Sequence, residues 1–160
     1  MITDVKEALL KDIEEQIKPL RVCFVCTGNT CRSPMAAAVL NQLGAGAYEA
    51  CSAGISAITG DPISKNAVTA LEAAGIENTP ANNYRSHTAT QISAEIAAKC
   101  DRIVAISKRH MMALIYAFPD MSEKITVMGR DIPDPFMGDQ RVYDECLKSI
   151  TDCIKETFAV

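Results

Sequence analysis

The chain has 160 residues, 48% of them hydrophobic and 22% charged, which is the length and composition of one globular domain with its own core. Its net charge of −4, without a basic stripe, argues against nucleic acid as a partner, and no apolar run is long enough to cross a membrane. Seven irregularly spaced cysteines and a charged N-terminus unlike a signal peptide predict a cytoplasmic protein with free thiols rather than a secreted disulfide framework.

A helix is expected close to the N-terminus, ahead of the main domain. Its apolar residues recur every four positions, and Asp4 and Glu7 have the spacing of a capping box. Pro19 ends the helix, because proline cannot continue the helical hydrogen-bond ladder. The sequence therefore predicts an N-terminal helical extension over 1–19 and one domain over 20–160.

Strands and helices alternate along the chain. The expected elements are, in order, helix 4–18, strand 20–25, helix 33–43, strand 48–51, helix 63–74, a short helix capped by Ser93, strand 102–106, helix 108–118, strand 125–128 and helix 140–158. This alternation is typical of a parallel sheet covered by helices on both faces. Ligands of such sheets bind at the carboxyl ends of the strands, which directs attention to residues 26–33 after the first strand.

The loop after the first strand reads CTGNTCRS and opens a helix, as a phosphate-binding loop does. Gly28 and Asn29 tolerate positive φ, so the backbone can curl its N–H groups around an anion. Arg32 offers a planar fork for two phosphate oxygens. The same positive field favours a thiolate at Cys26, which can attack phosphorus, and Ser33 can donate its hydroxyl to that thiolate.

The string VCFVCTGNTCRSPMAAAVL resembles the low-molecular-weight protein tyrosine phosphatase family, including its bacterial protein-arginine-phosphatase branch. The resemblance covers the chain after residue 19 and continues in CSAG at 51–54, SHTATQIS at 86–93, CDRIVAIS at 100–107 and DIPDPF at 131–136. It implies an α/β fold with a four-stranded parallel sheet, a phosphorylated protein as substrate, and neither a metal nor another cofactor. We expect a monomer.

The resemblance also assigns roles to individual residues. It makes Cys26 the nucleophile, Arg32 the phosphate-binding fork, and Asp134 the acid that protonates the leaving group and then activates water. The residues alone leave this acid open among 20 Asp and Glu side chains. Ser52 and His87 match positions that hydrogen-bond around the loop. The other phosphate-loop positions are Thr27, Gly28, Asn29, Thr30, Cys31 and Ser33.

Substrate choice is expected to depend on Thr30 and Phe136. Tyrosine-directed relatives typically carry an apolar branched residue at the position of Thr30, whereas the arginine-phosphatase branch resembles this chain in having threonine within CTGNTCRSPM. Phe136 is followed by Met137 and Gly138, where many tyrosine-directed relatives have a second aromatic residue. The prediction is a phosphoarginine phosphatase, with a phosphotyrosine phosphatase as the alternative.

The cysteines suggest two other kinds of site, a redox pair and a zinc site. Cys23 and Cys26 form a C-x-x-C pattern, but on a strand they lie about 10 Å apart, beyond the ~7 Å that a disulfide allows. A zinc site needs closely grouped ligands, and the remaining candidates are dispersed. These candidates are Cys51, Cys100, Cys146 and Cys153.

Two further functions are less favoured. Thioredoxin-coupled arsenate reductases need two neighbouring cysteines downstream, and Cys100 has no partner in 101–116. A binding module without catalysis needs neither the nucleophile Cys26 nor the acid Asp134.

His110, next to two basic residues, is expected on a solvated helix face.

Overall fold

A computed structural model describes residues 1–160, with six α-helices, two short 3-10 helices and four strands. In chain order they are α1 (Ile2–Gln16), β1 (Leu20–Cys26), α2 (Arg32–Leu43), β2 (Tyr48–Gly54), α3 (Lys65–Ala73), η1 (Tyr84–Ser86), α4 (Ala94–Lys99), β3 (Arg102–Ala105), α5 (Lys108–Ala117), η2 (Pro119–Lys124), β4 (Ile125–Val127) and α6 (Gln140–Phe158). This order confirms the predicted alternation of strands and helices.

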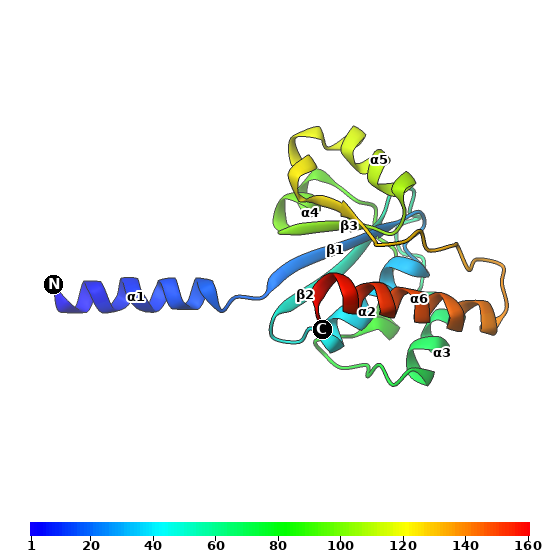
Figure 1. The fold of residues 1–160 in the computed structure, drawn as a ribbon, viewed down its shortest axis with the longest axis horizontal. Coiled ribbons are helices and arrows are strands. Elements are labelled where there is room, and N and C mark those ends of the chain that lie inside the picture. The colour runs from blue at the N-terminus through cyan, green and yellow to red at the C-terminus, as the bar shows by residue number, and fades with distance from the viewer.

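The four strands form one sheet in the order β2-β1-β3-β4, and every neighbouring pair is parallel, as predicted (Figure 1). The chain leaves β1 for β2 on one side and returns to β3 on the other. In open parallel sheets, this change of direction leaves a crevice at the carboxyl ends of the two central strands. Cys26 is the last residue of β1, one of these two central strands, so the loop after β1 begins at this crevice.

Helices cover both faces of the sheet. Helices α2, α3 and α6 lie on one face, and α4 and α5 lie on the other (Figure 1). Successive side chains of β1 alternate between the two cores: Phe24 and Cys26 belong to the core under α2 and α6, whereas Cys23 and Val25 belong to the core under α4 and α5. The predicted α/β sheet with helices on both faces is therefore confirmed.

The expected boundaries differ from the observed ones mainly at β2 and α1. Strand β2 continues to Gly54 because its pairing with β1 runs as far as Cys26. The predicted capping box is wrong: α1 begins at Ile2, Asp4 lies inside its first turn, and no side chain caps its N-terminus. Because the helix already includes residues 2 and 3, Asp4 does not occupy the N-cap position that a capping box requires.

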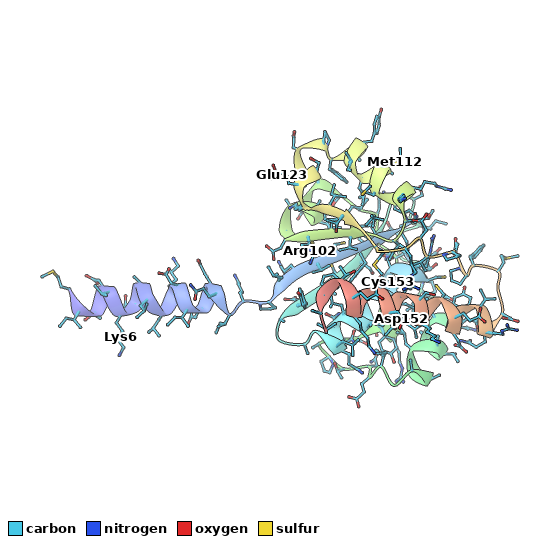
Figure 2. The ribbon with its side chains drawn as sticks, in the orientation of Figure 1. Lys6, Arg102, Met112, Glu123, Asp152 and Cys153 are labelled. Atoms are coloured by element: carbon cyan, nitrogen blue, oxygen red, sulfur yellow. The ribbon has the colours of Figure 1, made fainter.

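Helix α1 extends away from the rest of the molecule, and side chains such as that of Lys6 project from it into solvent (Figures 1 and 2). None of its residues is buried, and its apolar residues Val5 and Leu9 are 69% and 58% exposed. No helix of the protein combines the length and apolar character needed to cross a bilayer. We propose that residues 20–160 fold as a domain without help from α1.

Deleting residues 2–16 should leave both the thermal unfolding midpoint and phosphatase turnover unchanged, because α1 buries no side chain. Phe158→Ala, near the other terminus, is the matched control: this ring packs edge-on against Phe24, with centroids 6.1 Å apart, and its loss should cost about 3–5 kcal/mol. Thermal unfolding and hydrolysis of an aryl phosphate measure both effects. A deletion as destabilising as Phe158→Ala would contradict an independent domain.

Candidate functional site

The loop between β1 and α2 is built around the thiol of Cys26. This side chain is 2% exposed, and its Sγ lies 2.8 Å from the hydroxyl oxygen of Ser33, on the first turn of α2. Ser33 Oγ also accepts a hydrogen bond from Asn29 Nδ2 at 2.8 Å. The Ser33 hydroxyl can therefore donate its proton to the sulfur of Cys26, and the backbone oxygen of Ala53, at 3.4 Å, is its other acceptor.

Asn29 holds the middle of the loop. Its φ of 59° lies in the left-handed region, while Gly28 is not among the positive-φ residues, so the expected strain falls on Asn29 alone. The side chain is fully buried: Nδ2 donates to Ser33 Oγ and to Ser52 Oγ (3.0 Å), and Oδ1 accepts from the backbone N–H of Thr90 (2.9 Å). Asparagine tolerates this conformation better than other residues with a Cβ atom.

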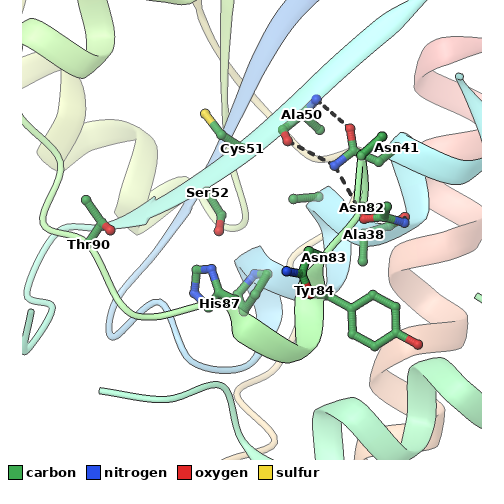
Figure 3. Close-up of a pocket in the computed structure, with 13 residues that line it drawn as sticks. Ala38, Asn41, Ala50, Cys51, Ser52, Asn82, Asn83, Tyr84, His87 and Thr90 are labelled. Carbon is green, nitrogen blue, oxygen red and sulfur yellow. Dashed lines mark hydrogen bonds between the residues drawn. The ribbon is translucent and has the colours of Figure 1, made fainter. Parts of the chain in front are cut away.

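The two supporting residues expected from the sequence both reach Asn29. Ser52 accepts one of its amide hydrogens, and His87 Nε2 donates to its backbone oxygen at 2.8 Å. Burial lowers the pKa of His87, which keeps the ring neutral. Ser52, His87 and Thr90 also line a cavity of about 270 Å³. Figure 3 shows these three side chains.

The end of β2 forms the floor under the loop. A Cβ atom on Gly54 would lie 2.5 Å from the backbone oxygen of Thr27 and 3.2 Å from the Cβ of Asn29. No side chain fits in that space. The backbone oxygens of Cys26 and Thr27 accept hydrogen bonds from Ile55 (2.9 Å) and Ser56 (3.0 Å), which tie the loop to the chain just beyond β2.

The mouth of the site is a pocket of about 220 Å³. Arg32 is 7% exposed and donates to the backbone oxygen of Ile132 at 3.1 Å, while its other terminal nitrogen lies 3.5 Å from Asp134 Oδ2. Asp134 accepts a hydrogen bond from the backbone N–H of Phe136. The side chains of Asp134 and Phe136, both in the loop after β4, line the pocket. The lining residues are Cys26, Thr27, Gly28, Asn29, Thr30, Cys31, Arg32, Asp134 and Phe136.

The pocket therefore brings together every residue predicted as catalytic, as substrate wall or as part of the loop, except Ser33, which lies behind the thiol. Cys31 is buried at the N-cap of α2, where its sulfur lies 3.4 Å from the hydroxyl of Tyr143 on α6. The pocket combines a buried sulfur, a guanidinium, a carboxyl group and a curled backbone at a helix N-terminus. This set of groups can bind a phosphoryl group and transfer it to sulfur.

His110 is a residue of this site that the sequence analysis placed wrongly. It is 3% exposed rather than solvated, and Nε2 lies 2.9 Å from Thr27 Oγ1 while Nδ1 lies 2.8 Å from Ser107 Oγ. Desolvation and then the charges of Arg32 and Arg109 lower the pKa of His110 to about 4. A neutral ring thus links the N-terminus of α5 to the phosphate loop. The two basic residues before His110 suggested an exposed position, and its burial became visible only in the fold.

The chain matches proteins of known activity over most of its length. A family model described as low molecular weight phosphotyrosine protein phosphatase matches residues 21–159. A protein-arginine-phosphatase of Geobacillus stearothermophilus is 35% identical over 78% of this chain and 84% of its own length. The low molecular weight protein-tyrosine-phosphatase Wzb of Salmonella typhi is 33% identical over 78% of this chain and 82% of its own.

Solved structures agree in fold. The YwlE arginine phosphatase from Geobacillus stearothermophilus superposes with a TM-score of 0.76 at 32% identity, covering 88% of this chain and 94% of that one. A low molecular weight protein tyrosine phosphatase from T. tengcongensis gives 0.79 at 31% identity, covering 88% and 98%. The chain belongs to the low-molecular-weight protein tyrosine phosphatase family and is a cysteine-dependent protein phosphatase.

The neutral His110 should make the protein less stable in mild acid. Its pKa is about 4 in the native state and about 6.5 when unfolded, so between these values the unfolded chain binds more protons and stability falls as the pH is lowered. The loss should reach at most about 3 kcal/mol below pH 4. His110→Gln keeps a polar partner for Thr27 but does not titrate there.

Denaturant unfolding of both proteins from pH 7 to pH 4 measures the difference. As the pH falls from 7 to 4, the free energy of unfolding should decrease more in the unmutated protein than in His110→Gln. Parallel curves would contradict a neutral, buried His110.

Proposed function

We propose that this protein hydrolyses phosphorylated side chains of proteins through a phosphocysteine intermediate on Cys26, and that its substrate is phosphoarginine. The observation that carries the catalytic part is the convergence of Cys26, Arg32 and Asp134 on one 220 Å³ pocket from three separate parts of the fold. Cys26 comes from the end of β1, Arg32 from the start of α2, and Asp134 from the segment between β4 and α6.

In the first step, the Cys26 thiolate attacks phosphorus. The S–P bond forms, the bond from phosphorus to the leaving group breaks, and the carboxyl proton of Asp134 passes to the departing atom. Arg32 and the loop N–H groups hold the three phosphoryl oxygens. Asp134 is 53% exposed at the pocket mouth, so a leaving group can reach it from solvent.

In the second step, water hydrolyses the phosphocysteine. Asp134, now a carboxylate, takes a proton from the attacking water while the O–P bond forms and the S–P bond breaks. The electron pair returns to sulfur, to which the Ser33 hydroxyl 2.8 Å away can donate a hydrogen bond. Phosphate leaves, and the enzyme is ready for a further turnover.

The proposal of phosphoarginine rests on the side chains that line the pocket beside the phosphate cradle. Thr30 lines the same pocket as Asp134 and Phe136, and Phe136 is its one aromatic residue. Phosphoarginine carries a planar group rich in N–H donors next to phosphorus, and the Thr30 hydroxyl is an acceptor for it. Relatives of both substrate classes match at similar identity, so substrate choice has to be tested directly.

The arsenate reductase alternative finds no support at the loop. The thiol of Cys100 lies with those of Cys23 and Cys51. All three belong to the side of the sheet under α4 and α5, whereas Cys26 belongs to the other core. A relay of disulfides from Cys26 would have to cross the sheet.

Replacing the nucleophile should separate turnover from binding. Cys26→Ser should abolish hydrolysis of an aryl phosphate but keep vanadate binding, because the amide cradle and Arg32 remain. Arg32→Ala should impair both, since the guanidinium binds the anion. Kinetics and a vanadate-binding titration on the same preparations measure this. Near-native kcat in Cys26→Ser would exclude the covalent mechanism.

Replacing Thr30 should change substrate preference. Thr30→Ile removes the hydroxyl and adds bulk, so it should lower kcat/KM for phosphoarginine peptides relative to phosphotyrosine peptides by an amount equivalent to ~1–3 kcal/mol. Thr30→Val keeps the size but not the hydroxyl, and Thr30→Ser keeps the hydroxyl alone. If the hydroxyl is the determinant, Val should resemble Ile, and Ser should resemble the unmutated enzyme.

The unmutated enzyme provides the decisive comparison. Phosphoarginine and phosphotyrosine peptides of the same sequence should be hydrolysed side by side, with kcat/KM higher for phosphoarginine. A preference for phosphotyrosine of about tenfold or more would reject the arginine assignment and leave the phosphatase assignment intact.

A further inference from the structure

Three cysteines that the sequence scatters across the chain meet beneath α4. Cys23 lies on β1, Cys51 lies opposite it in the register of β2, and Cys100 directly follows α4. Their three Sγ atoms all lie within 4.8 Å of one another. The expectation that Cys51 and Cys100 are too dispersed for a metal site is therefore wrong. Strand register places Cys51 beside Cys23, and the return of the chain to β3 brings Cys100 to both, which their spacing in the sequence does not show.

The dimensions of this thiol cluster, Cys23, Cys51 and Cys100, suit a metal ion. With Zn–S bonds of about 2.3 Å, a tetrahedral zinc ion holds its sulfur ligands about 3.8 Å apart. Sulfur atoms within 4.8 Å of one another reach that spacing by movements of less than about 1 Å, which rotations about the Cα–Cβ bonds supply.

The cluster is also accessible. Cys23 is fully buried and Cys100 is 7% exposed, but Cys51 is exposed on the edge strand β2. Figure 3 shows its sulfur on the face of β2 opposite to the Ser52 hydroxyl, away from the phosphate loop. A cavity of about 170 Å³ lined by Cys51 and Cys100 leads to the cluster.

Cationic side chains lie beside the cluster. Lys124 donates from Nζ to the backbone oxygen of Cys100 at 2.9 Å, and Arg21 lines the cavity. Three thiolates and a divalent ion carry a net charge of −1, which Lys124 offsets, whereas Arg21 is paired with Glu49 at the edge of the same cavity.

We propose that Cys23, Cys51 and Cys100 form a binding site for a thiophilic divalent ion of the zinc class. The ion takes three thiolate ligands and keeps its fourth position for water on the exposed Cys51 side. Three Zn–S bonds form, and each thiol that binds releases its proton to solvent. The site lies on the opposite side of the sheet from Cys26 and needs no step of the phosphatase reaction.

The test uses Co²⁺ as a spectroscopic substitute for Zn²⁺ in the full chain carrying Cys26→Ser and Cys31→Ser, so that the loop thiols cannot bind the metal. One equivalent of Co²⁺ should produce the near-ultraviolet thiolate charge-transfer absorption, and Zn²⁺ should remove it. Zn²⁺ at about 100 times its Kd should raise the unfolding midpoint by about 5–10 °C.

Matched variants identify the ligands. Adding Cys51→Ser, at an exposed position where serine is tolerated, should abolish both the absorption and the thermal shift, and Cys100→Ser should do the same. Cys153→Ala, in a buried thiol on α6 outside the cluster (Figure 2), should keep both. The proposal fails if the parent protein shows no charge-transfer band, or if the band survives Cys51→Ser in a protein that unfolds cooperatively.

Discussion

The site depends on the buried amide of Asn29. A left-handed conformation in a residue with a Cβ atom costs about 1 kcal/mol, and it persists only where the surroundings determine it. Here the surroundings are Ser33, Ser52, Thr90 and His87, which contact the side chain or the backbone oxygen of Asn29. One side chain thus joins the phosphate loop, α2, β2 and the segment before α4. The curvature that aims N–H groups at an anion is a property of this whole set of contacts.

A second set of contacts supports the loop from the α5 side. His110 reaches Thr27, and Ser107 holds the other ring nitrogen while also accepting from the backbone N–H of His110. The loop is therefore held from two directions by neutral histidines whose pKa values are both lowered by burial. Because these histidines are neutral, the positive charge of the site comes from Arg32 and the N-terminus of α2, next to the proposed phosphoryl position.

How much the sequence revealed depended on the range of the interactions. Local patterns predicted the strand Leu20–Cys26, the helix Gln140–Phe158 and the loop between β1 and α2 nearly to the residue, because hydrophobic periodicity and turn chemistry are local properties. Asp134 entered through family resemblance, since an isolated Asp-Pro step is also an ordinary turn. His110 and the thiol cluster were misjudged because burial and cross-strand neighbours depend on register, which no single segment encodes.

The glycine at the end of β2 has a consequence for how the protein folds. Gly54 is the one residue under the loop that has no side chain. The observed register of β1 against β2 places Gly54 below Thr27. A slip of one residue would bring Ala53 or Ile55 under the loop, with a Cβ atom where none fits. The cradle can close only over a correctly paired sheet, so a mispaired chain is also an inactive one. Binding of phosphate at the proposed site therefore requires correct strand pairing.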